Sequence, residues 1–378
     1  MLYVTYVAAK NVYTSEIIEI MRHFDVSKSA ASAATSFSFV AYAIVQLVFV
    51  KIAGKLNARK YLLICSPVSV ALFVLVPFCT EIWQVWILFA VTGALLSGVF
   101  PVCMLIISEY LPDELIPAAN KYMGLAFALS YVLDYALSAL FIHVADWRLG
   151  FFFFPAVYMV TVLFVCRMIR ICPRQQREKA EDEPQAAIDK KAVFRYLLIT
   201  GAVAFFVNIL YYAVSNWVPN LLSEQFGLTP ALSVFITLFV PLTGAAGAAV
   251  CLELCRRFPF WRVMLVLTAF SAALCLVLTG VYRIALIITL ALVIVLLFVL
   301  RGIAHVFGWQ VPINAKRIMN PTSAATVLNI FGCIGAAIGP PLFGALADNG
   351  SYTLFFIVSA IISFILAALA LAGSRAIK

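Results

Sequence analysis

The sequence predicts an all-α membrane protein with twelve transmembrane helices in two six-helix bundles. Hydrophobic residues make up 65% and charged residues only 11% of the 378 residues, whereas soluble domains carry about 25% charged residues. The apolar runs are long and lack the period-two alternation of membrane β-barrels, so we expect helices that satisfy their own backbone hydrogen bonds. One polar stretch divides the apolar sequence into two halves of similar size.

That polar stretch reads RICPRQQREKAEDEPQAAIDKKAVFR over residues 170–195. Its density of charged residues and Gln is too high for it to bury enough apolar surface to fold alone, so it is interpreted as a solvated linker. The predicted organisation is an N-terminal bundle over residues 1–170, a charged cytoplasmic linker over 171–193 and a C-terminal bundle over 194–378.

Each half contains six apolar runs long enough to cross a bilayer, which needs about 20 residues. The longer runs are expected to be tilted or kinked, for instance at Pro101. Only nine residues precede Lys10, so we expect the first helix to be shortened at its N-terminus. The predicted helices are 1–22, 31–55, 60–79, 83–111, 117–143, 150–170, 194–222, 231–256, 260–280, 283–313, 321–346 and 351–373.

The net charge of +9 does not indicate nucleic-acid binding, because the charges cluster between the apolar runs on one side of the predicted membrane. Most of the 26 Lys and Arg share a side with the two termini, and the opposite side holds Arg22, Lys28, Arg148 and Arg283. The positive-inside rule therefore places both termini and the linker in the cytoplasm. The predicted location is the plasma membrane, which is the inner membrane in a bacterium.

Several classes of site are not indicated by the sequence. The nine Cys are scattered through apolar runs without CxxC or metal-ligand spacing, so they are interpreted as packing residues. A GxxxxGK[ST] motif, a cleavable signal peptide and a paired nucleophile and base are all lacking. We therefore expect no cofactor, no metal and no enzymatic activity. The expected partners are the lipid bilayer and a small molecule, and the protein is expected to be a monomer.

Three segments and the organisation of the chain resemble the major facilitator superfamily. They are YVAAKN at residues 6–11, DWRLGFFFFPA at 146–156 and NWVPNLL at 216–222, together with a basic turn at 51–60. The sequence is most similar to the organophosphate:phosphate antiporter branch, which includes the glycerol phosphate and hexose phosphate permeases. It departs from that branch at two positions, because Ala9 and Tyr211 stand where the branch has a pair of phosphate-binding arginines. In the turn, Gly54 replaces the acidic residue of the loop motif.

Charged residues within the apolar runs are the first candidates for function, because a charge at the bilayer centre costs about 2.5 to 3.5 kcal/mol. The resemblance implies that helices one, four, seven and ten line a central cavity, which would place Lys10 and Arg301 across it, where they attract an anion. Arg301 and His305 are four residues apart and share one helix face. The other predicted substrate-binding residues are Asn11, Tyr211, Tyr212 and Trp309.

Asp134 and His305 are the candidates for proton coupling, because both titrate. Simpler readings stay open: Asp134 can form a structural ion pair with Lys10, and His305 can be a packing residue. Glu16 and Glu19 are interpreted as a solvated outer vestibule rather than as a coupling pair. The sequence GCIGAAIGPPLFG at 332–344 is expected to serve close helix packing and gating, and residues 243–250 look similar.

The function that fits these features is secondary active transport of a small organic anion, such as a sugar phosphate, a uronate or a carboxylate. The two bundles would rock around the site, as the resemblance implies, and anion exchange or proton coupling would drive the cycle. Two alternatives stay open: a membrane solute sensor built on a transporter fold, and an exporter of an amphipathic compound.

Overall fold

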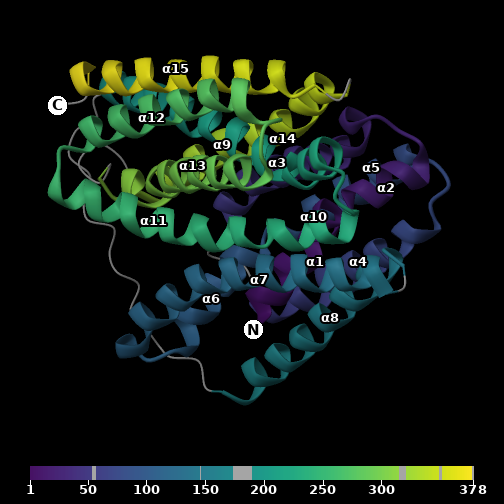
Figure 1. Ribbon diagram of the computed structural model, residues 1–378. Helices are drawn as coiled ribbons and strands as arrows, with labels where there is room; N and C mark the ends of the chain where they lie inside the picture. The colour runs from purple at the N-terminus through teal and green to yellow at the C-terminus, as the bar shows by residue number, and fades with distance from the viewer. Residues whose placement is uncertain (53–56, 145, 173–189, 315–320, 349–350, 377–378) are drawn as a thin grey trace. The chain divides into compact units, whose positions relative to one another are not determined.

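The computed structural model describes residues 1–52, 57–144, 146–172, 190–314, 321–348 and 351–376, and all regular structure in these ranges is helical (Figure 1). Eleven segments are long and apolar enough to cross a membrane, and the two shorter helices α1 and α2 precede them. The predicted all-helical membrane fold is confirmed. The longer helices are α1 (Leu2–Ser15), α2 (Ile17–Phe24), α3 (Lys28–Ile52), α4 (Ala58–Leu75), α5 (Ile82–Leu96), α6 (Val99–Tyr110), α7 (Ile116–Val144), α8 (Arg148–Ile171), α9 (Lys190–Phe226), α10 (Pro230–Thr237), α11 (Phe239–Arg257), α12 (Phe260–Val281), α13 (Leu286–Asn314), α14 (Pro321–Ala347) and α15 (Thr353–Ala376).

Three of the predicted spans are each divided into two helices. The first is interrupted at Glu16, between α1 and α2, the fourth between α5 and α6, and the eighth between α10 and α11. Prolines explain the last two interruptions, because Pro101 and Pro241 have no N–H to bond the carbonyls four residues before them. The expected kink at Pro101 is thus found about one turn before the proline itself.

Tyr61 of α4 satisfies backbone groups that the break between α5 and α6 leaves open. Its hydroxyl group accepts a hydrogen bond from the Gly98 N–H at 2.9 Å and donates one to the Leu95 carbonyl. The Ser97 hydroxyl donates to the Ala94 carbonyl at 2.7 Å. Because lipid offers no hydrogen-bond partner, these two side chains allow the helix to be interrupted inside an apolar span.

The chain forms two compact units, and each is described by itself. Unit 1 comprises Met1–Val26, Phe37–Glu183 and Pro230–Leu238, and unit 2 comprises the remaining residues, including Ser27–Ser36. Each unit contains a short segment from the other half of the sequence. The first turns of α3 belong to unit 2, whereas the rest of α3 belongs to unit 1. Helix α10 belongs to unit 1, whereas the next helix, α11, belongs to unit 2. Residues 173–189 of the predicted linker lie outside the described residues, and the predicted domain boundaries stay a prediction.

In unit 1, α1 is central, because it packs against both α7 and α8, and α8 also packs against α4. Helix α10 packs on α7, where Val234 joins Tyr135 and Ala139 in a buried apolar cluster. The placement of α1 matters for function, because it carries Lys10, Ser15 and, at its end, Glu16.

In unit 2, α9 packs against α14, α12 against α15 and α11 against α13 (Figure 1). Gly335 and Gly339 of α14 make the first contact so close that an added Cβ would clash with the backbone carbonyls of Phe205 and Ile209 of α9. Gly247 of α11 meets the carbonyl of Phe298 of α13 in the same way. The predicted packing role of both glycine stretches is confirmed, since only a residue without a side chain fits there.

Candidate functional site

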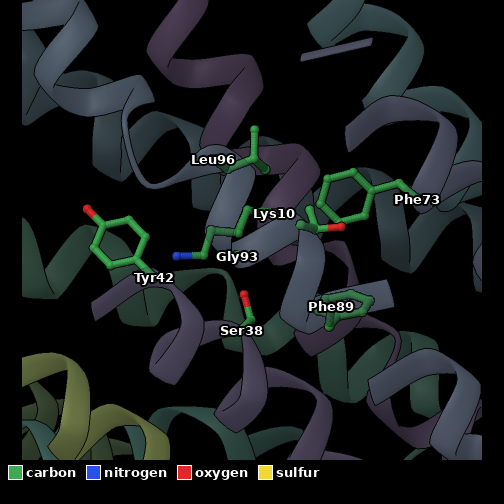
Figure 2. Close-up of a pocket in the computed structure, with 8 residues that line it drawn as sticks. Lys10, Ser38, Tyr42, Phe73, Phe89, Gly93 and Leu96 are labelled. Carbon is green, nitrogen blue, oxygen red and sulfur yellow. The ribbon is translucent and has the colours of Figure 1, made fainter. Parts of the chain in front are cut away.

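Lys10 lies in a pocket of unit 1 between α1, α3, α4 and α5. Its Nζ atom is 4.7 Å from the centroid of the Phe39 ring and 5.0 Å from that of Tyr42, both on α3. Figure 2 shows the amino group pointing toward Tyr42. A cation over aromatic faces gains about 0.5 to 2 kcal/mol. The pocket is a narrow recess in this conformation, lined by Lys10, Ser38, Tyr42, Phe73, Phe89, Thr92, Gly93 and Leu96.

Close packing of α3 on α5 gives this pocket its shape. Gly93 lies directly on the backbone of Ser38, where any Cβ would clash with the Ser38 carbonyl. Aromatic contacts close the deeper side, because Phe89 lies 4.6 Å from Tyr13 and 5.8 Å from Phe73 between ring centroids. The pocket therefore combines one cation and the hydroxyl groups of its lining residues with apolar walls, a combination that suits a small anion with an apolar body.

Arg301 lies on α13 in unit 2, where its guanidinium carbon is 5.2 Å from the ring centroid of Tyr211 on α9. The Arg301 stem packs against Gly244 of α11, because a Cβ added there would lie 3.1 Å from the Arg301 Cγ. Tyr212 meets the Tyr211 ring edge-on at 5.3 Å. The structure thus brings together Arg301, Tyr211 and, through that ring, Tyr212, and His305 lies one turn further along α13 and half-buried.

The remaining predicted site residues are placed less completely. Asn11 follows Lys10 on α1, and its side-chain nitrogen is buried without a hydrogen-bond partner among the described residues. Trp309 belongs to α13, but its side chain lies outside the described part of the chain, as does the turn containing Gly54. Lys10 and Arg301 belong to different units, so their convergence on one cavity stays a prediction.

Asp134 of α7 is fully buried, and its partners are serines. The Ser15 hydroxyl group donates a hydrogen bond to the Asp134 Oδ1 atom at 3.1 Å, and the Oγ atoms of Ser15 and Ser138 are 2.9 Å apart. The ion pair between Asp134 and Lys10 that the sequence left open is not formed, because Lys10 instead lies over the two rings of α3.

The environment of Glu16 differs from the one that the sequence predicts for the outer end of the first span. The predicted solvated vestibule is wrong for Glu16, which is fully buried at the junction of α1 and α2. Glu19 is accessible and pairs with Arg22 at 3.0 Å. The burial of Glu16 arises because α1 packs against α7 and α8, which no local pattern reveals. The only available signal was a carboxylate inside an apolar run.

Trp217 of α9 is fully buried in unit 2. Its indole N–H donates to the Pro340 carbonyl of α14 at 2.8 Å. This bond adds a polar contact to the close packing between α9 and α14.

Comparisons with known proteins agree with this architecture. The family model of the Major Facilitator Superfamily matches residues 1–325. The cis,cis-muconate transport protein of Acinetobacter baylyi is 23% identical over 296 residues, which are 71% of this chain and 67% of that protein.

Among solved structures, a bacterial homologue of the human lysosomal transporter Spinster has a TM-score of 0.81 at 14% identity and covers 99% of this chain and 95% of that one. The nucleoside transporter NupG, solved as a mutant, has a TM-score of 0.73 at 12% identity, over 100% and 99% of the two chains. These likenesses concern the fold. The chain therefore belongs to the Major Facilitator Superfamily and is a membrane transporter rather than an enzyme.

Proposed function

We propose that this protein is a secondary active transporter of a small organic anion, and that a carboxylate is the preferred class. The observation that carries the proposal is the Lys10 ammonium group, seated in a pocket with aromatic walls and hydroxyl groups. Lys10 is half-buried, and the rings of α3 hold its ammonium group at the pocket. A carboxylate that enters the pocket neutralises the charge, while its apolar body contacts the rings.

Arg301 is the second proposed anion-binding group. Its guanidinium group offers a fork that matches the two oxygens of a carboxylate, and its carbon atom lies 5.2 Å from the centroid of the Tyr211 ring. We propose that Arg301, like Lys10, contributes to anion binding. Asn11, Tyr212, His305 and Trp309 supply further polar or aromatic contacts.

Two observations favour a carboxylate over an organophosphate. The muconate transport protein carries a carboxylate, and the phosphate-binding arginine pair of the organophosphate branch is replaced by Ala9 and Tyr211. The assignment to that branch stays a prediction. We also propose that both termini lie in the cytoplasm of a plasma membrane, from the distribution of Lys and Arg, and that the protein works as a monomer.

Uptake into proteoliposomes tests the proposal. The probes are cis,cis-muconate, a uronate and a sugar phosphate, each applied to wild type and to Lys10→Gln and Arg301→Gln variants. Removing a charged contact is worth about 1.5 to 3 kcal/mol, so each variant should bind the preferred probe at least about tenfold more weakly. Lys60→Gln is the matched control, because Lys60 is exposed at the start of α4.

The result separates the rival functions. Unchanged affinity in both variants would exclude the proposed site. Binding by wild type without any uptake would favour a solute sensor, and uptake of amphipathic compounds in place of anions would favour an exporter.

A further inference from the structure

We propose that Glu16 and Asp134 share a proton in unit 1, and that this pair is the coupling site of the transport cycle. The site is formed by two consecutive residues at the end of α1, Ser15 and Glu16, and by two residues one turn apart on α7, Asp134 and Ser138. All four are fully buried, with exposed fractions of 0 to 1%.

The serines connect the two carboxyl groups. Ser15 donates to the Asp134 Oδ1 atom at 3.1 Å and lies 2.9 Å from the Ser138 Oγ atom. The Ser138 hydroxyl group also lies close enough to interact with the carboxyl groups of both Glu16 and Asp134. Every carboxyl oxygen except Oδ1 of Asp134 is buried without a hydrogen bond of good geometry to a described group. These oxygens are where a shared proton can sit.

Among the described residues, the charged neighbours that act on Glu16 are acidic: Asp134 itself, Glu19 of α2 and Asp146 before α8. Arg148 at the start of α8 bonds Asp146 at 3.4 Å. Two adjacent buried carboxylates cannot both be ionised without a large penalty. At least one of them therefore carries a proton, which converts one unsatisfied acceptor into a donor.

The residues of α8 and α10 that the structure places nearest to the pair are not titratable. From α8, Gly150 faces Glu16, because a Cβ added at Gly150 would lie 3.0 Å from the Glu16 Oε1 atom. From α10, the apolar Val234 packs against Tyr135 and Ala139 of α7. The Cβ added at Gly150 would also lie 2.8 Å from the Val12 Cγ2 atom, so α8 approaches α1 closely beside Glu16.

The position of the pair links it to the proposed substrate site. Glu16 lies at the junction of α1 and α2, and Lys10 lies six residues earlier on α1, about 9 Å along the helix axis. An anion that binds Lys10 and shifts α1 also moves Ser15 and Glu16 relative to α7. Such a shift brings the two carboxyl groups closer and strengthens their hold on the shared proton, so that the anion and the proton are carried inward together. This coupling step rests on the proposed function, whereas the shared proton does not.

Infrared difference spectroscopy of the reconstituted protein tests the shared proton without any substrate. Wild type at neutral pH should show the carbonyl stretch of a protonated carboxylic acid, sensitive to H/D exchange. Both Glu16→Gln and Asp134→Asn should remove or shift that band, while the control Glu19→Gln, which changes an accessible acid one turn away, should leave it in place. Ser138→Ala should shift the band without removing it, which provides a second readout if either carboxyl variant fails to fold.

A spectrum whose acid band responds to neither carboxyl variant would overturn the proposal. So would Na⁺-dependent thermal stabilisation that is lost in Asp134→Asn without any acid band, because it would assign the site to sodium. The coupling step is measured separately, as accumulation of cis,cis-muconate driven by an inward proton gradient. Glu16→Gln should bind this probe within about twofold of wild type yet lose accumulation. If the wild type takes up no muconate but shows the shared band, the proposed function fails and the proton site stands.

Discussion

Replacement of Lys28 should destabilise the protein by breaking an ion pair in unit 2. Lys28 begins α3, and its ammonium group lies 3.0 Å from the Glu224 Oε1 atom of α9 and donates to the Ala347 carbonyl at 2.8 Å. Its backbone N–H donates to the Asp348 carboxylate at 2.8 Å, a bond that a substitution of the side chain leaves intact.

The size of the effect follows from burial. Breaking a fully buried pair costs about 3 to 5 kcal/mol, whereas exposed pairs contribute about 0 to 1 kcal/mol. The Lys28 side chain is 6% exposed but the Glu224 side chain is 32% exposed. The Lys28→Met variant should therefore lose about 1 to 3 kcal/mol of unfolding free energy, between these two limits.

A double-mutant cycle with Lys28→Met and Glu224→Gln isolates the pair, with unfolding of the purified protein in detergent as the readout. The expected interaction energy is about 0.5 to 3 kcal/mol, and Lys60→Met, at an exposed lysine, should change stability by less than about 0.5 kcal/mol. An interaction energy near zero would refute this reasoning, because it would mean that Lys28 contributes only through packing and its bond to the Ala347 carbonyl.

Three further predictions concern packing, a helix break and pH. Gly339→Ala should lower the unfolding free energy by about 1 to 3 kcal/mol, measured by thermal unfolding, because the added Cβ meets an α9 carbonyl. The control Gly280→Ala should leave stability unchanged, because a Cβ there has no atom within 4 Å. Equal losses of stability in the two variants would refute the role of the contact. Tyr61→Phe should lower stability by about 1 to 3 kcal/mol, because it leaves backbone groups at the α5–α6 break unsatisfied; an unchanged unfolding midpoint would show that other groups satisfy them. Burial, and then the charge of Glu224, raise the pKa of Tyr352 above its usual value near 10. Since the folded state thus favours the neutral phenol, its contribution is complete below about pH 10 and is lost as the pH rises further. The stability of wild type should fall more steeply there than that of Tyr352→Phe, and parallel pH profiles would contradict this.

The sequence was sufficient for the architecture, because long apolar runs in lipid have few alternatives to helices. It also located the breaks near Pro101 approximately, since proline acts locally on its own helix. The sequence also predicted part of the candidate site, because Lys10 and Arg301 are charged residues within apolar runs. Their aromatic partners, Phe39 and Tyr211, come from other helices, and of these only Tyr211 was singled out.

Glu16 shows where local reasoning ends. No Pro or Gly marks the interruption between α1 and α2, and position along the helix placed this residue toward water. Its burial depends on the approach of α7 and on the absence of a side chain at Gly150 of α8, contacts between residues more than a hundred positions apart. Such a residue is recognised only when the tertiary neighbours are known.

The reciprocal sharing of segments bears on how the chain can be divided. Ser27–Ser36 are encoded in the first half of the gene but are built into unit 2, and Pro230–Leu238 are encoded in the second half but are built into unit 1. If the chain is divided between these two segments, each fragment lacks a segment of its own unit and contains a segment of the other unit. Neither fragment should fold when it is synthesised alone, and co-expression of the two should restore folding of both.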